Sequence, residues 1–133
     1  MVYLLDTNAC IQLWQRKHER LRAHFIECSP ANVAICSIVK AELLFGAMRS
    51  AHQVSNLALL QKLFAPLQSF DFDNNAAEHY AQIRADLTER GTLIGGNDLI
   101  IAAIARANHA TLVTHNTREF ARVDGLALVD WEI

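Results

Sequence analysis

The chain has 133 residues, a length typical of one domain, and 52% of them are hydrophobic, which excludes an intrinsically disordered protein. We therefore expect a single domain over residues 1–133. The 12 basic and 14 acidic residues give a net charge of −2, so a uniformly basic nucleic-acid binder is also excluded. A local basic surface is still allowed, because residues 1–65 contain seven basic residues against four acidic ones.

The cysteine pattern and the lack of a long apolar segment predict a soluble, cytoplasmic protein. Cys10, Cys28 and Cys36 are odd in number and contain no C-x-x-C pair, so we interpret them as reduced thiols packed in the core. Their spacing gives no support to a zinc site. No apolar run approaches the ~18 residues of a membrane span, and no charged and apolar leader precedes the first predicted strand.

The order of apolar and amphipathic segments predicts five short strands separated by helices. The strands are expected at 2–5, 33–36, 67–72, 110–114 and 126–129. The helices are expected at 9–27 with a break near 17–18, and at 38–49, 52–64, 74–90, 98–108 and 117–120. This alternation is typical of an α/β domain whose parallel sheet is covered by helices on both faces.

Polar residues follow several of the predicted strands. Asp6 comes directly after the first strand, Ser37 after the second, and Thr114–Asn116 after the fourth. Right-handed crossovers place the carboxyl ends of parallel strands on one edge of the sheet, where the ligand crevice of such sheets lies. We therefore expect these residues to share a cleft with Glu42, which lies in the helix that Ser37 is predicted to cap.

Three carboxylates are candidates for that cleft, and each also has a purely structural explanation. Asp6 and Asp98 stand at predicted helix starts, and a helix N-cap contributes ~0.5–2 kcal/mol. Glu42 lies too far into its helix for a capping box with Ser37, whose partner position holds Lys40, but it could be a solvated boundary residue. Carboxylates gathered at one edge repel each other unless a cation neutralises them. Their coincidence therefore favours a metal site.

The segment from Thr114 to Phe120, THNTREF, offers further candidates. Asn116 could ligate a metal or a bound water through its amide oxygen, and Glu119 could supply a fourth carboxylate. The alternatives are a helix start at Asn116 and a surface pair of Arg118 with Glu119. His115 is interpreted as a polar rim residue rather than a general base.

Ligands that are all oxygen atoms select hard divalent ions such as Mg²⁺ or Mn²⁺ rather than zinc. Such an ion orients a substrate phosphate and lowers the pKa of a bound water. The sequence has no serine or cysteine nucleophile in a recognised catalytic setting, so water is the natural attacking group. Phosphate contacts could come from several basic residues, which are also ordinary helix-surface residues. These are Arg16, Lys17, Arg20, Arg22 and Arg118.

Four motifs together resemble the PIN-domain ribonucleases. They are LLDTN at 4–8, the helix start SIVKAEL from Ser37, IGGNDLIIAAIA at 94–105 and LVTHNTREF at 112–120. The Asp130-Trp131 ending resembles the VapC toxins of bacterial type II toxin–antitoxin pairs. The resemblance covers essentially the whole chain, in order and at the right spacing. It implies a three-layer α/β/α fold around a central parallel sheet of about five strands.

The resemblance also implies the roles of individual residues. Asp6, Glu42 and Asp98 fall on acidic positions of the family and would hold Mg²⁺ or Mn²⁺. PIN domains commonly have a fourth acid just after the fourth strand, where this chain has Asn116. Either a second metal site is weakened, or Glu119 takes over as the fourth catalytic carboxylate. Polar groups that would hold the carboxylates or position the substrate are Thr7, Asn8, Ser37, Asn97, Thr114, Asn116 and Arg118.

The implied function is metal-dependent endoribonuclease cleavage of RNA that stops translation. Relatives with this NTREF pattern resemble enzymes that cut initiator tRNA in its anticodon loop. The implied partners are a second copy, in a homodimer, and a VapB antitoxin whose C-terminal segment occupies the acidic cleft. Two other functions stay open: a metal-dependent nuclease or phosphatase outside toxin–antitoxin systems, and a non-catalytic module whose acidic cleft receives a basic partner segment.

Overall fold

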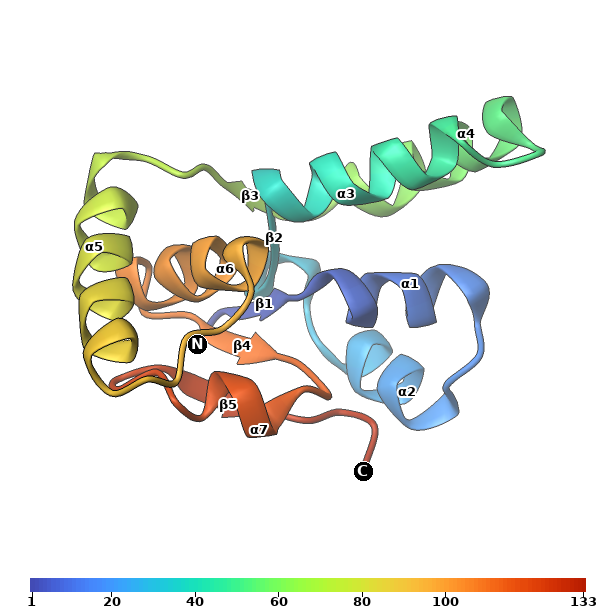
Figure 1. Cartoon of the computed structure of the whole chain (residues 1–133). Coiled ribbons are helices and arrows are strands. Elements are labelled where there is room, and N and C mark those ends of the chain that lie inside the picture. The colour runs from blue at the N-terminus through green and yellow to red at the C-terminus, as the bar shows by residue number, and fades with distance from the viewer.

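A five-stranded parallel sheet forms the centre of the computed structural model, which describes residues 1–133. The strand order is β3-β2-β1-β4-β5, so the first strand lies in the middle (Figure 1). All four neighbouring pairs are parallel, as the sequence predicts. The strands are β1 Tyr3–Leu5, β2 Val33–Cys36, β3 Gln68–Phe70, β4 Thr111–Val113 and β5 Ala127–Val129.

The strands confirm the predicted apolar runs, although β3 is shorter than the predicted 67–72. All four residues of β2 are buried, whereas Gln68 and Ser69 of β3 are exposed. β3 lies at an edge of the sheet and pairs only with β2, whose last residue, Cys36, faces Phe70. Because the partner strand ends there, the ladder of hydrogen bonds cannot continue to residue 72.

Seven α-helices and one short 3₁₀ turn at Pro30–Asn32 connect the strands. The break predicted near residues 17–18 is confirmed, because Arg16 adopts a left-handed backbone conformation, with φ of 53°, and ends the first helix. The helices are α1 Thr7–Gln15, α2 Glu19–Glu27, α3 Ser37–Met48, α4 Gln53–Phe64, α5 Asn74–Glu89, α6 Gly96–Ala107 and α7 Thr117–Phe120.

The helices form two layers around the sheet. The chain moves from β1 through β2 to β3 in one direction and then returns across the sheet to β4 and β5. Since crossovers between parallel strands are right-handed, the helices α1–α4 and α5–α7 cover opposite faces. In the first group α1 packs against α2, α3 and α4, and in the second α5 packs along α6. The predicted three-layer α/β/α architecture is confirmed.

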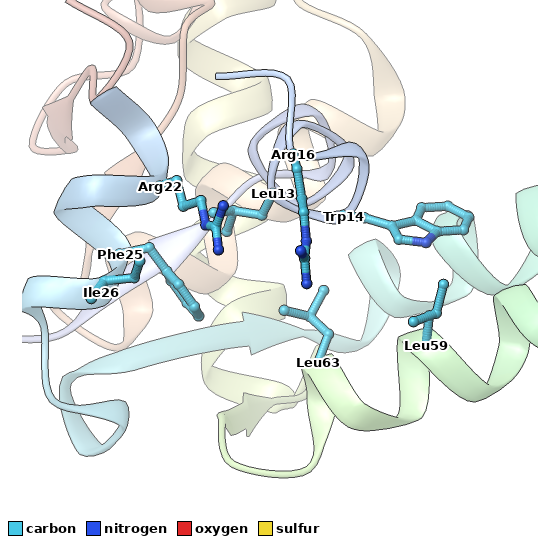
Figure 2. Close-up of a pocket in the computed structure, with 8 residues that line it drawn as sticks. All are labelled: Leu13, Trp14, Arg16, Arg22, Phe25, Ile26, Leu59 and Leu63. Atoms are coloured by element: carbon cyan, nitrogen blue, oxygen red, sulfur yellow. The ribbon is translucent and has the colours of Figure 1, made fainter. Parts of the chain in front are cut away.

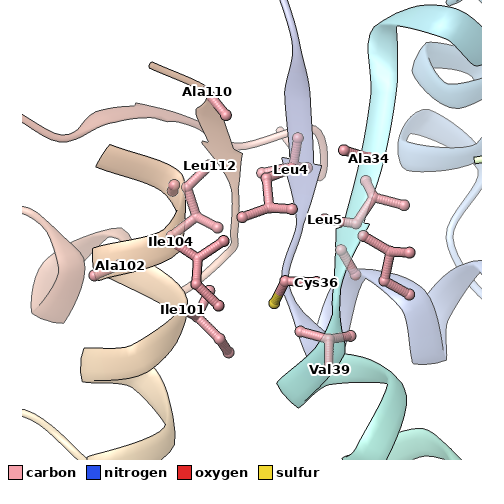
Figure 3. Packing of buried hydrophobic residues seen from close by; sticks show 14 of the residues in the cluster. Leu4, Leu5, Ala34, Cys36, Val39, Ile101, Ala102, Ile104, Ala110 and Leu112 are labelled. Atoms are coloured by element: carbon pink, nitrogen blue, oxygen red, sulfur yellow. The ribbon is translucent and has the colours of Figure 1, made fainter. Parts of the chain in front are cut away.

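The hydrophobic core lies on both faces of the sheet, around the central strand β1. Leu4 and Leu5 are neighbours in β1, their side chains point to opposite faces, and both are fully buried. Figure 3 shows these residues between Ile104 of α6 and Leu112 of β4 on one side and Ala34 of β2 on the other. A strand with two buried faces has a continuous apolar sequence, which explains why the strands lack polar alternation.

Two of the predicted helix caps are wrong. Ser37 is already the first residue of α3, and Asp98 lies in the first turn of α6, which begins two residues earlier after Gly95. Neither helix has a side-chain cap hydrogen bond. Asp6 does cap α1, because its carboxylate accepts a hydrogen bond from the backbone N–H of Ala9. The Asp98 carboxylate is therefore not used as a cap.

None of the seven helices is both long and apolar enough to cross a membrane.

Replacing a core side chain on α6 should destabilise the protein strongly. Ile104 is fully buried, so Ile104→Ala should lower the free energy of unfolding by about 2–5 kcal/mol through lost burial and the resulting cavity. The matched control is Ile26→Ala on α2, where the side chain is 66% exposed and the change should stay within about 0.5 kcal/mol. Urea unfolding measures both, and equal losses would contradict this description of the core.

Candidate active site

A small polar cavity lies at the carboxyl edge of the sheet and has a volume of about 160 Å³. It opens where β1 passes into α1, beside the starts of α3 and α6. Only one of its seven lining residues is apolar. The lining residues are Asp6, Thr7, Asn8, Glu42, Asp98, Asn116 and Phe120. The structure therefore brings Asp6, Glu42 and Asp98 together, as the strand order led us to expect.

Asp6 is the most buried of these carboxylates, with 6% of its surface exposed. Its Oδ1 accepts a hydrogen bond of 2.8 Å from the backbone N–H of Ala9. Burial raises the pKa of Asp6 to about 6, and the hydrogen bonds from Ala9 and the Thr114 hydroxyl only partly offset this effect. The negative charges of Asp98 and Glu132 raise the pKa further. The buried Asp6 carboxylate is therefore costly to ionise unless a positive charge lies beside it.

Glu42 reaches the cavity from the second turn of α3 and is held there by Thr7. The hydroxyl of Thr7 donates a hydrogen bond of 2.8 Å to Oε1 of Glu42, which links residues 35 positions apart in the sequence. Glu42 is half-buried, so it is not a solvated surface acid. The bond leaves Oε2 of Glu42 free to accept another hydrogen or bind a cation.

Asp98 and Glu119 lie close enough to influence one another. The pKa of Asp98 is raised, first by burial and then by the negative charges of Glu119 and Glu42. Asn116 lines the cavity and its amide nitrogen donates a hydrogen bond of 3.1 Å to Oε2 of Glu119. The amide oxygen of Asn116 has no hydrogen-bond partner in the chain. Both candidates for the fourth member of the cluster are therefore near it: Asn116 on the wall, and Glu119 behind it.

The remaining predicted residues fall into two groups. Asn8 lines the cavity, and Thr114 is buried beside it, where its hydroxyl accepts a hydrogen bond of 3.0 Å from the backbone N–H of Asn116. Ser37, Asn97 and Arg118 do not line the cavity, and their side chains form no hydrogen bond within the chain. Arg118 is exposed, and the alternative of a surface ion pair with Glu119 is wrong, because Glu119 bonds to Asn116 instead.

Sequence reasoning missed two residues that shape the site. Phe120 is buried and forms the only apolar part of the wall, and Glu132 contributes to the raised pKa of Asp6. A signal for Glu132 exists in the ending Asp130-Trp131-Glu132. Residues 131 and 132 form a turn, in which Trp131 is buried and the backbone N–H of Glu132 donates a hydrogen bond of 2.9 Å to Oδ1 of Asp130. His115 is exposed at the rim, and Asp130, which accepts a hydrogen bond from its ring, raises its pKa.

The donor set of the cavity fits a hydrated hard cation. Carboxylate, hydroxyl and amide oxygens are the ligands that Mg²⁺ and Mn²⁺ prefer. No three carboxylates of the cavity have oxygens within 4.8 Å of one another. Mg²⁺ keeps several waters and binds through only one or two carboxylates. A volume of about 160 Å³ holds an ion together with waters of ~30 Å³ each.

A second and larger hollow, of about 310 Å³, lies between α1, α2 and α4, and we call it the α1–α2–α4 groove. Figure 2 shows the side chains of Arg16 and Arg22 extending into it beside apolar neighbours. Neither guanidinium forms an ion pair within the chain. The groove is thus apolar with two unneutralised positive charges. Its lining residues are Leu13, Trp14, Arg16, Arg22, Phe25, Ile26, Leu59 and Leu63.

Comparison with known proteins decides the family. The model of the PIN domain matches residues 3–126. The tRNA(fMet)-specific endonuclease VapC of Salmonella typhimurium is 38% identical over 129 residues, which cover 97% of each chain. Ribonuclease VapC2 of Rickettsia felis is 38% identical over 134 residues, which cover 99% of each. The chain belongs to the VapC ribonucleases of the PIN-domain family. The family predicted from the four motifs is confirmed.

Solved structures of VapC relatives have the same fold over nearly the whole length. The DNA-bound complex VapBC2 of Rickettsia felis contains a chain that superposes with a TM-score of 0.92 at 36% identity, covering 98% of this chain and 99% of the other. The DNA-bound VapBC of Salmonella typhimurium gives a TM-score of 0.92 at 37% identity, with 98% of each chain covered. PIN-domain nucleases generally depend on a divalent metal, and the acidic cavity of this VapC chain is the corresponding candidate site.

Removing the charge of Asp6 should stabilise the metal-free VapC chain at high pH. The raised pKa means that the folded chain holds this proton more tightly than the unfolded chain between about pH 4 and 6, so this group's contribution to stability falls as pH rises through that window. Asp6→Asn keeps the oxygen that accepts from Ala9 and should raise the free energy of unfolding at pH 8 by about 1–3 kcal/mol.

Urea unfolding in the presence of a chelator, at several pH values from about 4 to 8, measures this difference. The gap between the variant and the wild type should be small at the acidic end and should grow with pH. A variant that is less stable than the wild type at pH 8 would contradict the assigned cost of ionising Asp6.

Proposed function

We propose that this chain is the toxin of a type II toxin–antitoxin pair and acts as a divalent-metal-dependent endoribonuclease. The observation that carries the proposal is the convergence of Asp6, Glu42 and Asp98 in one polar cavity of a PIN fold. The names of the VapC relatives, which are ribonucleases and endonucleases, support the reaction class. The structures of relatives in VapBC complexes support the partner.

Asp6 and Asp98 are the proposed ligands of the metal, which we assign as Mg²⁺ or Mn²⁺. When bound, this ion supplies a water of lowered pKa and stabilises negative charge on the phosphate oxygens. Asp98 lies in the first turn of α6, where the partial positive charge of the helix N-terminus favours its ionised form. Asp6 is the N-cap residue of α1, and the buried hydrogen bond that its carboxylate accepts from the backbone N–H of Ala9 fixes its orientation.

Glu42 is the proposed acceptor that ligates the metal or orients the attacking water. Its hydrogen bond from Thr7 holds one carboxylate oxygen, and the other is left for water. Asn116 and Glu119 complete the cluster as a linked pair in our proposal, with the free amide oxygen of Asn116 directed to water or metal. Asn8 and Thr114 act as positioning groups, because they lie on the wall or directly behind it.

RNA is the proposed substrate, and tRNA is the proposed class of RNA. The Salmonella relative is named for cleavage of tRNA(fMet), and the NTREF pattern of this chain resembles such enzymes. We propose initiator tRNA, cut in its anticodon loop. The phosphate contacts would come from Arg118 and from the exposed residues Arg16, Lys17, Arg20 and Arg22, none of which has an ion-pair partner within the chain.

Asp98→Asn should abolish RNA cleavage while leaving the fold intact. The substitution removes a proposed metal ligand that forms no cap and no hydrogen bond within the chain, so we expect activity to fall by at least about 10³-fold. The assay uses purified initiator tRNA, another tRNA, an mRNA fragment, DNA and a small phosphoester, each with Mg²⁺ and with a chelator. The control is Asp71→Asn, which changes an exposed aspartate remote in sequence from the cluster.

The panel also tests the proposed function as a whole. Cleavage of the DNA or the phosphoester with equal efficiency would favour a different metal-dependent hydrolase. No cleavage of any substrate, together with no calorimetric uptake of millimolar Mg²⁺ or Mn²⁺, would favour a binding module. Wild-type cleavage by Asp98→Asn or by Asp6→Asn would overturn the assigned cluster.

The proposed antitoxin contact spans two surfaces that share α1. Residues at the start of α1 line the acidic cavity, and residues at its end line the α1–α2–α4 groove. The nine residues of α1 make these surfaces about 13 Å apart along the helix. An antitoxin segment with apolar and acidic residues fits the groove, because Arg16 and Arg22 need negative partners there. A basic residue at its end fits the acidic cavity, in keeping with the predicted position of the antitoxin.

Trp14→Ala should weaken antitoxin binding by at least about tenfold without affecting RNA cleavage by the free toxin. Large aromatic side chains at the centre of an interface carry much of its binding energy, and Trp14 lines the groove beside Leu59. The control is Phe45→Ala, which truncates an aromatic side chain that is 62% exposed outside the groove. Calorimetric titration with the cognate antitoxin measures both variants. If Phe45→Ala loses affinity and Trp14→Ala does not, the surface is wrongly assigned.

For the toxin without its antitoxin, we propose a homodimer.

A further inference from the structure

Four titratable side chains form a second cluster at the same sheet edge, outside the acidic cavity. Nδ1 of His115 lies 2.9 Å from Oδ2 of Asp130 and 4.0 Å from Oε2 of Glu132. These three ligand atoms all lie within 4.8 Å of one another, and no other trio of histidine, cysteine or carboxylate side chains does so. The fourth member, His18, has Nε2 at 3.6 Å from Oε1 of Glu132. None of the four lines the acidic cavity.

The carboxylates of this cluster are held rigidly by the end of the chain. Trp131 is buried between them, and its ring lies 5.6 Å from that of His24 in a stacked arrangement and 5.1 Å from that of Tyr3. The side chains of Asp130 and Glu132 are only 9% and 12% exposed. Oδ1 of Asp130 accepts a hydrogen bond of 2.9 Å from the backbone N–H of Glu132, so Oδ2 is left to face His115.

His18 orients Glu132 rather than joining the ligand set. Its Nδ1 accepts from the backbone N–H of Leu21 at the start of α2, so the proton of the neutral ring sits on Nε2. That N–H faces Oε1 of Glu132 and leaves Oε2 toward His115. Each carboxylate therefore has one oxygen engaged elsewhere and one oxygen that faces Nδ1 of His115. Such outer partners of a ligating carboxylate are a regular feature of protein metal sites.

We propose that His115, Asp130 and Glu132 form a second metal site, selective for a transition ion of the Zn²⁺ type rather than for Mg²⁺. One imidazole and two carboxylates suit Zn²⁺ or Co²⁺, whereas the all-oxygen cavity suits the hard ions Mg²⁺ and Mn²⁺. Ligands at 2.0–2.2 Å from such an ion lie roughly 3–3.6 Å apart. Nδ1 of His115 lies 2.9 Å and 4.0 Å from the two carboxylate oxygens, so small side-chain rotations would bring the three groups onto one ion. The two negative charges match one divalent ion. The proposal can be tested separately from the proposed function, because none of its three ligands lines the acidic cavity, although the charge of Glu132 influences Asp6.

The test is Zn²⁺ titration of the full-length chain by calorimetry in the Asp98→Asn background, which disables the acidic cavity. One Zn²⁺ should bind, and adding His115→Ala should weaken that binding by at least about tenfold. The matched control, His52→Ala, removes an exposed histidine between α3 and α4 and should change nothing. Asp130→Asn, which keeps the acceptor oxygen for Glu132, should weaken binding in the same way as His115→Ala.

A second measurement reports the ligand directly. Long-range ¹H–¹⁵N spectra of the histidine rings should show Zn²⁺ on Nδ1 of His115, and Mg²⁺ should leave that ring unchanged. His115 is 57% exposed, so its replacement should not disturb folding, and thermal unfolding without metal checks this. Equal Zn²⁺ affinity with and without His115, or loss of Zn²⁺ binding from Asp98→Asn alone, would overturn the proposal. The cluster would then be an ion-pair network only.

Discussion

The burial of carboxylates close together at one edge of a parallel sheet is the constraint on which the site of this structure depends. Asp6 is buried, and burial raises its pKa. Burial also raises the pKa of Asp98, and the negative charges of Glu119 and Glu42 raise it further. Helices α1, α3 and α6 begin beside this cavity, and their partial positive N-terminal charges offset part of the cost of these negative charges. The raised pKa values mean that ionising these carboxylates costs stability, and a cation bound at the proposed site would offset this cost.

The same topology makes α1 the element that joins the acidic cavity to the α1–α2–α4 groove. Its first residues follow the central strand and reach the acidic cavity, while its last residues reach the α1–α2–α4 groove. The left-handed conformation of Arg16 ends the helix and turns the chain toward α2. One partner segment lying along α1 would contact both surfaces at once. In our proposal such a segment would inhibit the toxin by covering this face, without a change of shape in the toxin.

Much of the fold could be predicted from sequence patterns, since most strands are short apolar runs and the helices have their own periodicity. The predictions failed at points that local sequence does not decide. β3 is shorter than expected because β2 ends opposite Phe70. Asp98 resembles a cap in sequence, but α6 begins two residues earlier and leaves its carboxylate to the cavity. Among the candidate site residues, Ser37 and Asn97 stay outside the cavity despite their positions at predicted helix starts.

The sequence by itself determined the α/β class, the family and the three carboxylates, because motif spacing and strand order are properties of the chain. Tertiary structure decided how these groups are held. Thr7 bonds to Glu42 across 35 positions, and Glu119 joins Asn116 rather than Arg118. It also decided that His115 meets Asp130, since β4 and β5 lie side by side and a buried tryptophan anchors the chain end. Such contacts depend on distances between remote residues, which only the packed molecule sets.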